Sequence, residues 1–554
     1  MIKTDDSTSY KKLNTGYISS IIGSLIEIKG FEKQVRIHDL IRETKHNILG
    51  EVIQIYSDHV TAQCFENTYN LKLGEAVINL NEPLSMDLGP GLLGNVFDGI
   101  QRPIDASFKN NSNGFIERGF ELPSLSRTKK WHFKPKIKVN SKISNGDIIG
   151  TVQESLSIEH RIMVPIGING TLSFIASEGD YIVTDEIFRV KMNNGEKSFT
   201  MLQKWPITKN RPYKMRKPPT EPLITGIRVI DLLFPIAKGG TVAVPGGFGT
   251  GKTVIQQSLA KWCNADIIIF VGCGERGNEI ADVLKQFTEL TDPKSGRPLL
   301  ERIVLIANTS NMPVSAREAS IFSGVTIGEY YRDMGYDVAV LADSTSRWAE
   351  SLREISGLLE EMPAEEGYPA YLPSKISSFY ERAGVVKLVG ENKERDGSLT
   401  IIGSVSPPAG DFSEPVTATT KRFVQGFWAL DASLAYSKHY PAINWLSSYS
   451  NYPDYISDWW FERDIFWPEI DLDWYECRTM VNNILSQENE LRNITQLIGE
   501  ENLPEDQQLI LFITKLIRNS FLIQNAFDNI DNFTSSLKLI GQIKLILLLY
   551  KEGE

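Results

Sequence analysis

The sequence predicts a multidomain protein whose central part is an α/β domain, with β-rich segments before it and helices after it. Five near-continuous apolar runs alternate with helical stretches: TVAVP, DIIIFVG, RIVLIAN, DVAVLAD and LTIIGSV. This pattern is typical of a parallel sheet covered on both faces. Short alternating runs precede these strands, and a helical pattern follows Asp473. The 554 residues suffice for about three or four domains of ~100–200 residues each.

The chain divides into five predicted segments. Residues 1–83 form a β-barrel, because alternating apolar runs such as YISSIIGSLIEIKG are bounded by Gly and Asn. Residues 84–107 connect it to an inserted β-rich domain at residues 108–190, with repeated Gly-Asp and Gly-Asn turns. The insertion resembles a lipoyl-type barrel but has no lysine at the tip of its turn, so we expect a structural role. Residues 191–431 form the α/β domain, and residues 432–554 form a mainly helical domain.

The overall composition is that of an ordinary globular protein with an acidic balance. The net charge is −11 and the pI is about 5.3, which argues against nucleic acid as the main partner. The spacing of the cysteines fits neither a metal site nor a disulfide framework and favours a reducing compartment; they are Cys64, Cys263, Cys273 and Cys477. The polar N-terminus is no signal peptide, and the run Leu537 to Tyr550 is too short for a membrane span.

A phosphate-binding loop is predicted in AVPGGFGTGKTV. The pattern G-x-x-x-x-G-K-[ST] lies between a predicted strand and a predicted helix. Glycines let successive backbone N–H groups face one anion, and the helix N-terminus adds partial positive charge. Lys252 should reach the β- and γ-phosphates, and the Thr253 hydroxyl should hold Mg²⁺. The predicted nucleotide-binding residues of this loop are Gly246, Gly247, Phe248, Gly249, Thr250, Gly251, Lys252, Thr253 and Val254.

Two further strands end in residues suited to phosphate chemistry. Asp343 ends the strand DVAVLAD and is predicted to lie near Mg²⁺, as the acid of a Walker B strand does. Glu275 follows the strand DIIIFVG and is predicted to orient the attacking water at the nucleotide crevice. Arg276 and Arg347 are candidates to neutralise phosphate charge. Surface ion pairs are the alternative interpretation for both arginines.

These motifs together resemble the catalytic A subunit of V-type (vacuolar or archaeal-type) rotary ATPases, over nearly the whole chain. The resemblance is carried by GCGERGNE, ADSTSRWAESLREISGLLEEMPAEEGYPAYL, SFYERAG, SVSPPAGDFSEPVT, PAINWLSSYS and LIQNAFDNID. It implies that the α/β domain is a RecA-like P-loop NTPase domain. By position, Lys252 and Thr253 match the family's phosphate-loop pair, Glu275 its catalytic carboxylate and Asp343 its Walker B acid. It implies that Arg276 and Arg347 lie beside the phosphates.

The resemblance also implies partners and a location. ATP or ADP with Mg²⁺ would bind in a hexamer of alternating A and B subunits, and the B subunit would supply an arginine finger. Central-stalk subunits D and F, peripheral-stalk subunits E and G, and a membrane sector that moves H⁺ or Na⁺ would complete the complex. The chain would lie peripherally at the cytoplasmic face of a membrane, without a transmembrane segment or a nucleic-acid partner. We expect the adenine to rest on Phe427 and Phe527.

Three other classes of protein remain as alternatives. An F-type β subunit, or a flagellar or secretion ATPase, would lack the insertion at residues 108–190. A Rho-like RNA translocase would need basic loops facing the pore, whereas PAEEGYPAYLPSK is acidic to neutral. A noncatalytic nucleotide-binding subunit would not be expected to keep Lys252, Glu275 and Asp343 together. The family's thiol sensitivity should not apply here, because the phosphate loop has Thr250 where eukaryotic relatives commonly have Cys.

Overall fold

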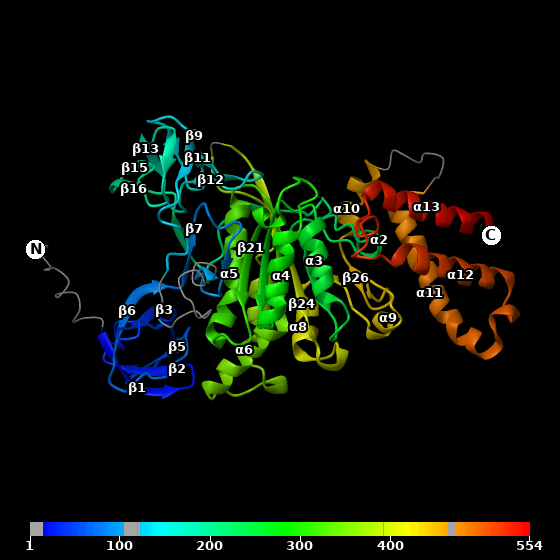
Figure 1. Cartoon of the computed structure of the whole chain (residues 1–554), viewed down its shortest axis with the longest axis horizontal. Helices are drawn as coiled ribbons and strands as arrows, with labels where there is room; N and C mark the ends of the chain where they lie inside the picture. The colour runs from blue at the N-terminus through cyan, green and yellow to red at the C-terminus, as the bar shows by residue number, and fades with distance from the viewer. Residues whose placement is uncertain (1–14, 105–118, 120–121, 392, 464–471, 554) are drawn as a thin grey trace, which may run out of the picture.

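The N-terminal part of the computed structural model is a closed six-stranded barrel (Figure 1). The structure describes residues 15–104, 119, 122–391, 393–463 and 472–553, so the predicted starts of the barrel and of the insertion lie outside the described residues. Alternating side chains such as Ile26, Ile28 and Val52 fill the barrel interior. The strands follow the order β1 (Thr15–Ile22), β2 (Leu25–Lys29), β5 (Val60–Cys64), β4 (Leu49–Ile55), β3 (Asp39–Glu43) and β6 (Ala76–Pro83).

The insertion consists of two four-stranded antiparallel sheets with a shared core around Phe133, Leu172 and Phe188. One sheet contains β12 (Glu159–Met163), β11 (Ile148–Gln153), β9 (Trp131–Pro135) and β14 (Gly179–Tyr181). The other contains β10 (Lys142–Ile143), β13 (Gly170–Ile175), β15 (Phe188–Met192) and β16 (Gly195–Phe199). The hairpin of β15 and β16 carries this sheet beyond residue 190, the predicted limit of the insertion. A two-stranded pair, β7 (Ser85–Leu88) with β17 (Gln203–Pro206), lies at the base of the insertion.

The centre of the molecule is a ten-stranded, mostly parallel sheet. The five predicted apolar runs are β19 (Thr241–Pro245), β20 (Ile267–Cys273), β21 (Ile303–Asn308), β22 (Asp337–Asp343) and β24 (Asp396–Val405). Their order is β19-β24-β22-β20-β21, all parallel. The remaining strands are β8 (Val96–Phe97), β18 (Met215–Lys217), β23 (Gly384–Lys387), β25 (Gly426–Phe427) and β26 (Tyr449–Ser450). The sheet therefore takes in residues on both sides of the predicted limits 191 and 431.

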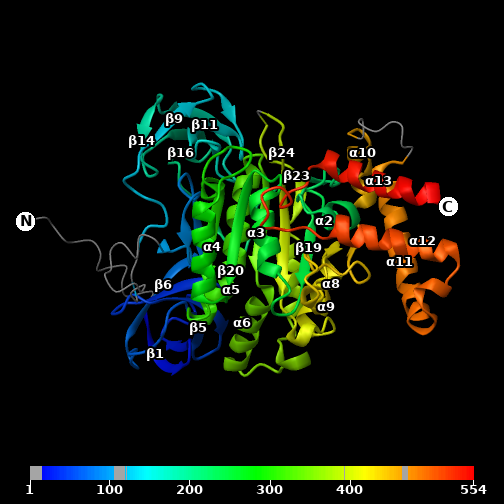
Figure 2. The same ribbon diagram turned by 45° about the vertical axis from the view of Figure 1, so that its right-hand side comes forward.

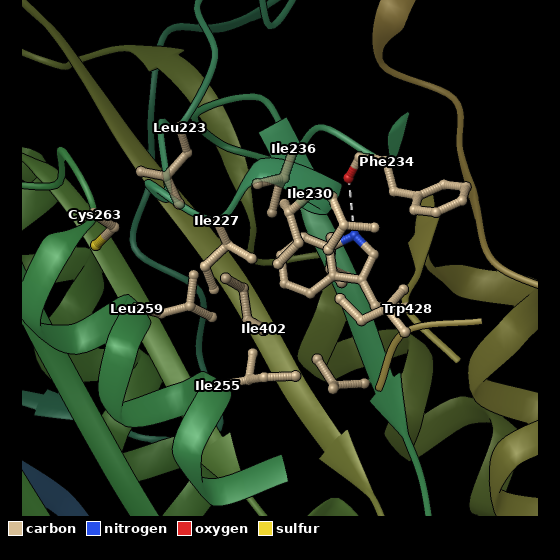
Figure 3. Packing of buried hydrophobic residues seen from close by; sticks show 14 of the residues in the cluster. Leu223, Ile227, Ile230, Phe234, Ile236, Ile255, Leu259, Cys263, Ile402 and Trp428 are labelled. Carbon is tan, nitrogen blue, oxygen red and sulfur yellow. Dashed lines mark hydrogen bonds between the residues drawn. The ribbon is translucent and has the colours of Figure 1, made fainter. Parts of the chain in front are cut away.

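Helices cover both faces of this sheet (Figures 1 and 2). They are α2 (Arg228–Leu233), α3 (Lys252–Trp262), α4 (Gly277–Glu289), α5 (Val314–Asp333), α6 (Thr345–Leu358), α7 (Leu372–Tyr380), α8 (Pro415–Phe423) and α9 (Ala432–Tyr436). Figure 3 shows Ile227 and Ile230 at α2 packed with Ile255 and Leu259 of α3. The indole N–H of Trp428 donates to the Phe234 carbonyl oxygen at 2.9 Å in the same core. Buried apolar side chains therefore join α2 and α3 to the sheet.

In the described residues after 452, four α-helices and a short π-helical turn form the C-terminal part, as the sequence predicts. They are α10 (Pro453–Phe461), α11 (Trp474–Ile498), α12 (Glu505–Leu516), the turn at Ile517–Leu522 and α13 (Ser536–Gly553). A capping box of Asp473 and Glu476 begins α11. Leu539, Ile543 and Leu547 bury one face of α13, whose apolar run the sequence predicted to be a packed helix. Among the described residues, no helix has both the length and the apolar character needed to cross a membrane.

Candidate functional site

A large cavity of about 1580 Å³ opens at the carboxyl edge of the central sheet. This exceeds the ~300–1,000 Å³ of most small-molecule pockets. Its lining comes from the phosphate loop, from the ends of β20 and β22, and from the segment 523–527 near the C-terminus. Ligands of open α/β sheets bind outside the carboxyl ends of the strands, so the cavity lies where this fold places a ligand.

The phosphate loop connects β19 to α3 in a conformation that only glycine adopts readily. Gly249 and Gly251 have positive φ values of 77° and 91°, and a Cβ at Gly251 would lie 3.8 Å from the ring of Tyr440. The Thr250 hydroxyl donates to the Gly247 carbonyl oxygen at 2.9 Å. The residues from Gly247 to Val254 all line the cavity, whereas Gly246 is buried below the loop.

Lys252 and Thr253 begin helix α3 and face the cavity. The ammonium group of Lys252 donates to the carbonyl oxygens of Gly246 (2.5 Å) and Gly247 (3.0 Å). Burial lowers the pKa of Lys252, while the carboxylates of Asp343 and Glu275 act in the opposite direction. An anion at this helix N-terminus would meet backbone N–H groups, the helix dipole and this ammonium group together.

Asp343 ends β22 next to Thr253. The Thr253 hydroxyl donates to the Asp343 carboxylate at 3.3 Å, and burial raises the pKa of Asp343. A buried carboxylate beside a hydroxyl is an oxygen donor set of the kind that Mg²⁺ prefers. A cation here would also relieve the cost of burying the negative charge of Asp343. The residues therefore fit a magnesium ion.

Glu275 lies between β20 and α4 and points into the same cavity. Its pKa is raised to about 8, first by burial, then by repulsion from Asp343, and then by a hydrogen bond with Glu279. Its backbone carbonyl oxygen accepts from Ser310 N–H at 2.9 Å, which holds the turn in place. A strongly perturbed carboxyl group in a cleft is a candidate general base.

The two predicted phosphate-side arginines also line the cavity. Arg276 is exposed at the start of α4. The guanidinium of Arg347, on α6, donates to both carboxylate oxygens of Glu350 at 2.9 and 2.8 Å. Glu350 also lines the cavity, so this ion pair lies at the site. The structure therefore brings all the predicted phosphate-side residues to one place.

Of the two predicted adenine contacts, Phe427 and Phe527, only one lies at the cavity. Phe527 lines the cavity and is 82% exposed. Phe427 is only 1% exposed and does not line it, because β25 turns its ring into the core between Phe412 and Tyr449. The structure therefore does not bring Phe427 to the cavity. Tyr440, which lines the cavity with its ring beside Gly251, was missed.

Several other lining residues were also missed. Glu279 lies one helical turn after Glu275, and this spacing could have revealed it. Arg317 of α5 lines the cavity and donates to the Ser310 carbonyl oxygen at 3.1 Å. Tyr440 and Arg317 have no local sequence signal of this kind, since the fold brings them to the site from distant segments.

The fold and the site define the class of this protein. A phosphate loop, a Walker B aspartate and a glutamate at the edge of a RecA-like sheet are the parts of a P-loop nucleoside triphosphatase. Four family models match the chain. The nucleotide-binding domain of the ATP synthase alpha/beta family matches residues 226–450, and the beta-barrel domain of that family matches residues 18–81. The alpha/beta subunit barrel-sandwich domain matches residues 122–208, and the C-terminal domain of V and A type ATP synthase matches residues 463–553.

Similarity to individual relatives identifies the family of this nucleoside triphosphatase. The chain is 52% identical to the A subunit of the A-type ATP synthase of Methanopyrus kandleri, over 97% of this chain and 90% of the relative. It is 50% identical to the V-type ATP synthase alpha chain of Thermoanaerobacter pseudethanolicus, over 98% and 90%. The chain belongs to the family of A or alpha subunits of A-type and V-type ATP synthases. The secretion ATPase EscN of enteropathogenic E. coli shares the fold, with a TM-score of 0.66, 20% identity, and 96% of this chain and 100% of that chain covered.

Proposed function

We propose that this chain is the catalytic subunit of a rotary A/V-type ATPase, and that it hydrolyses or synthesises ATP. The observation that carries this proposal is that the phosphate loop, Asp343 and Glu275 line one cavity. Family membership supports it, because the relatives are named as subunits of ATP synthases. Hydrolysis or synthesis would be coupled through a rotating central stalk to the transport of H⁺ or Na⁺.

The phosphate chain of ATP would bind at the N-terminus of α3. Loop N–H groups would hold the β-phosphate, and Lys252 would leave the carbonyl oxygens of Gly246 and Gly247 to reach the β- and γ-phosphates. Thr253 and Asp343 would hold Mg²⁺, which when bound neutralises charge on the phosphates. Arg276 and Arg347, which also line the cavity, would stabilise charge that develops on the γ-phosphoryl group.

Glu275 would orient and polarise the attacking water. It can accept a proton only when ionised, and its pKa of about 8 disfavours ionisation at neutral pH. Arg347 already acts to lower this pKa, and a cation bound at Asp343 would lower it further, whereas the negative phosphates would act in the opposite direction.

We further propose the partners that the family implies. A B subunit would alternate with this chain in a ring and supply an arginine finger to the phosphates. Stalk subunits D and F, peripheral subunits E and G, and a membrane sector would complete the complex. This chain would then lie peripherally at the cytoplasmic face of the membrane. The adenine would rest on Phe527, which is exposed in the cavity.

The proposed activity can be tested with Lys252→Ala in the assembled complex. We expect weaker binding of Mg·ATP and loss of ATP turnover, since the ammonium group contacts the phosphates that react. Lys261→Ala is the matched control, because Lys261 lies on the same helix but does not line the cavity. If Lys252→Ala kept both binding and turnover while the complex stayed intact, the phosphate site would lie elsewhere.

A further inference from the structure

Arg228 of α2 is a buried arginine whose hydrogen bonds converge on one distant segment of the chain. It is 3% exposed, and its guanidinium and backbone N–H together donate to five groups within residues 521–534. The acceptors are the carbonyl oxygens of Phe521 (2.6 Å) and Ile523, the carboxylate of Asp531 (2.6 Å), the hydroxyl of Thr534 (3.2 Å) and the side-chain oxygen of Gln524 (2.8 Å). The planar guanidinium thus holds a loop of irregular backbone.

The segment held by Arg228 also forms part of the cavity wall. Residues 523–527 line the cavity together with the phosphate loop, although Arg228 itself does not. The Asp531 carboxylate connects Arg228 to the cavity wall, because it accepts from Arg228 and also from Asn525 N–H at 2.8 Å. Gln524 N–H donates to the Tyr440 carbonyl oxygen at 2.8 Å, so the segment is also bonded to another aromatic residue of the cavity wall.

Further contacts hold helix α2, which carries Arg228, in position. Figure 2 shows α2 between the central sheet and the C-terminal helices. Asp231 accepts from Thr225 and Gly226 at the start of α2, and a Cβ at Gly226 would lie 2.1 Å from the ring of Phe533. Phe533 stacks on Trp262 at the end of α3, with ring centroids 4.9 Å apart. The helix that begins at the phosphate loop therefore also contacts the segment that Arg228 holds.

We propose that Arg228 is a positioning residue for the nucleoside part of ATP. It holds residues 523–527 against the cavity, so that the exposed ring of Phe527 is presented to the base. Without the hydrogen bonds from Arg228, residues 523–527 would have to become ordered when the nucleotide binds. The entropic cost of this ordering would weaken nucleotide binding. The phosphates, held by the loop at residues 246–254, would be unaffected. This inference rests on the proposed function.

The test compares two ligands that differ in the nucleoside. Dissociation constants for Mg·ATP and for Mg·tripolyphosphate are measured on the full chain, for wild type, Arg228→Met and Asp531→Asn. We expect Arg228→Met to weaken ATP binding by at least about tenfold, the equivalent of one charged hydrogen bond, and to leave tripolyphosphate binding unchanged. Asp531→Asn should also raise the ratio of the Mg·ATP dissociation constant to the Mg·tripolyphosphate dissociation constant, but by a smaller factor. Arg302→Met is the control, a buried arginine that donates to the carbonyl oxygens of Ala260 and Ala265 and does not line the cavity.

The possible outcomes test the positioning role of Arg228 and the proposed function separately. An unchanged ratio of the two dissociation constants in a folded Arg228→Met variant would overturn the positioning role. Equal weakening of both ligands would overturn it too, because Arg228 would then act on the whole site. If Arg228→Met does not fold, Asp531→Asn decides by the same ratio, since Asp531 is 34% exposed. Failure of the wild-type chain to bind either ligand would instead contradict the proposed function.

Discussion

Glu275 shows at the scale of one residue how the site separates binding from chemistry. Its carboxyl group is partly buried, close to Asp343 and hydrogen-bonded with Glu279, and its pKa is about 8. The groups that we propose to bind the phosphates are, by contrast, the backbone N–H groups and Lys252 at the start of α3. Loss of the carboxylate should therefore leave the phosphate cradle intact.

Glu275→Gln is expected to keep Mg·ATP affinity and to lose turnover. General-base contributions are typically about 10²–10⁴-fold, so the rate of the assembled complex should fall by at least that order. Equilibrium binding and steady-state ATP hydrolysis are measured on the same preparation. Glu289→Gln, at the exposed end of α4, the helix that follows Glu275, is the control. Equal loss of binding and turnover would remove Glu275 from the role of base.

The raised pKa of Glu275 also predicts how stability depends on pH. The folded state holds this proton up to about pH 8, whereas the ordinary pKa is 4.5. The stability that the protonated group contributes is therefore full below about pH 4.5 and is lost as the pH rises through about 8. Without nucleotide, the Tm of Glu275→Gln relative to wild type should rise between pH 5 and pH 9. Parallel Tm profiles for the two proteins would contradict the raised pKa.

Sequence patterns predicted the site residues that end or directly follow strands of the parallel sheet. The phosphate loop, Asp343 and Glu275 each end or follow a strand, and parallel strands bring such ends to one edge. An aromatic base contact has no such rule. Phe527 proved to be exposed in the cavity, whereas Phe427 entered the core because β25 pairs with β19.

Helix α5 shows at the scale of an element how the insertion is joined to the nucleotide-binding domain. Glu154, fully buried after β11, accepts from the Tyr331 hydroxyl at 3.0 Å and from three backbone N–H groups, those of Gly91, Leu92 and Leu93. His160 lies 2.6 Å from the same carboxylate and 2.9 Å from the hydroxyl of Tyr330. One carboxylate therefore joins β11–β12, the connector and α5.

Glu154→Ala is expected to destabilise this junction by roughly 3–5 kcal/mol, since it leaves buried donors without an acceptor. Amide hydrogen exchange should speed up at Gly91, Leu92 and Leu93 in particular. Glu154→Gln keeps an acceptor oxygen and should show a smaller effect. Unchanged exchange at these amides in Glu154→Ala would show that the junction is held by other contacts.

Sequence periodicity predicted the long elements and missed the short ones. The five apolar strands are buried on both faces, so their pattern was unmistakable. The two-residue strands β8, β25 and β26 are too short to show any period. They join the central sheet only through pairing with strands far away in sequence, and so the limit at 431 fell inside that sheet. The limit at 190 fell within β15, which pairs with β16 in a hairpin.

At the scale of the whole molecule, one chain brings to a single cavity the residues that we propose as phosphate cradle, metal-binding pair and base. The wide cavity, about 1580 Å³, leaves the phosphate side accessible. We propose that a neighbouring subunit completes this site, as the family implies. Supplying an arginine in trans is worth about 10³–10⁵-fold in rate in nucleoside triphosphatases that use one. The geometry of the interface would then set the rate and connect it to rotation of the stalk.

The most direct measurement of this account is ATP turnover by the chain alone and by the chain assembled with a B subunit, at saturating Mg·ATP. We expect the isolated chain to bind Mg·ATP but to hydrolyse it at least about 10³-fold more slowly than the assembled ring. Glu275→Gln in the assembled ring sets the background rate. An isolated chain that hydrolysed ATP as fast as the assembled ring would contradict the claim that this site is completed by a neighbour.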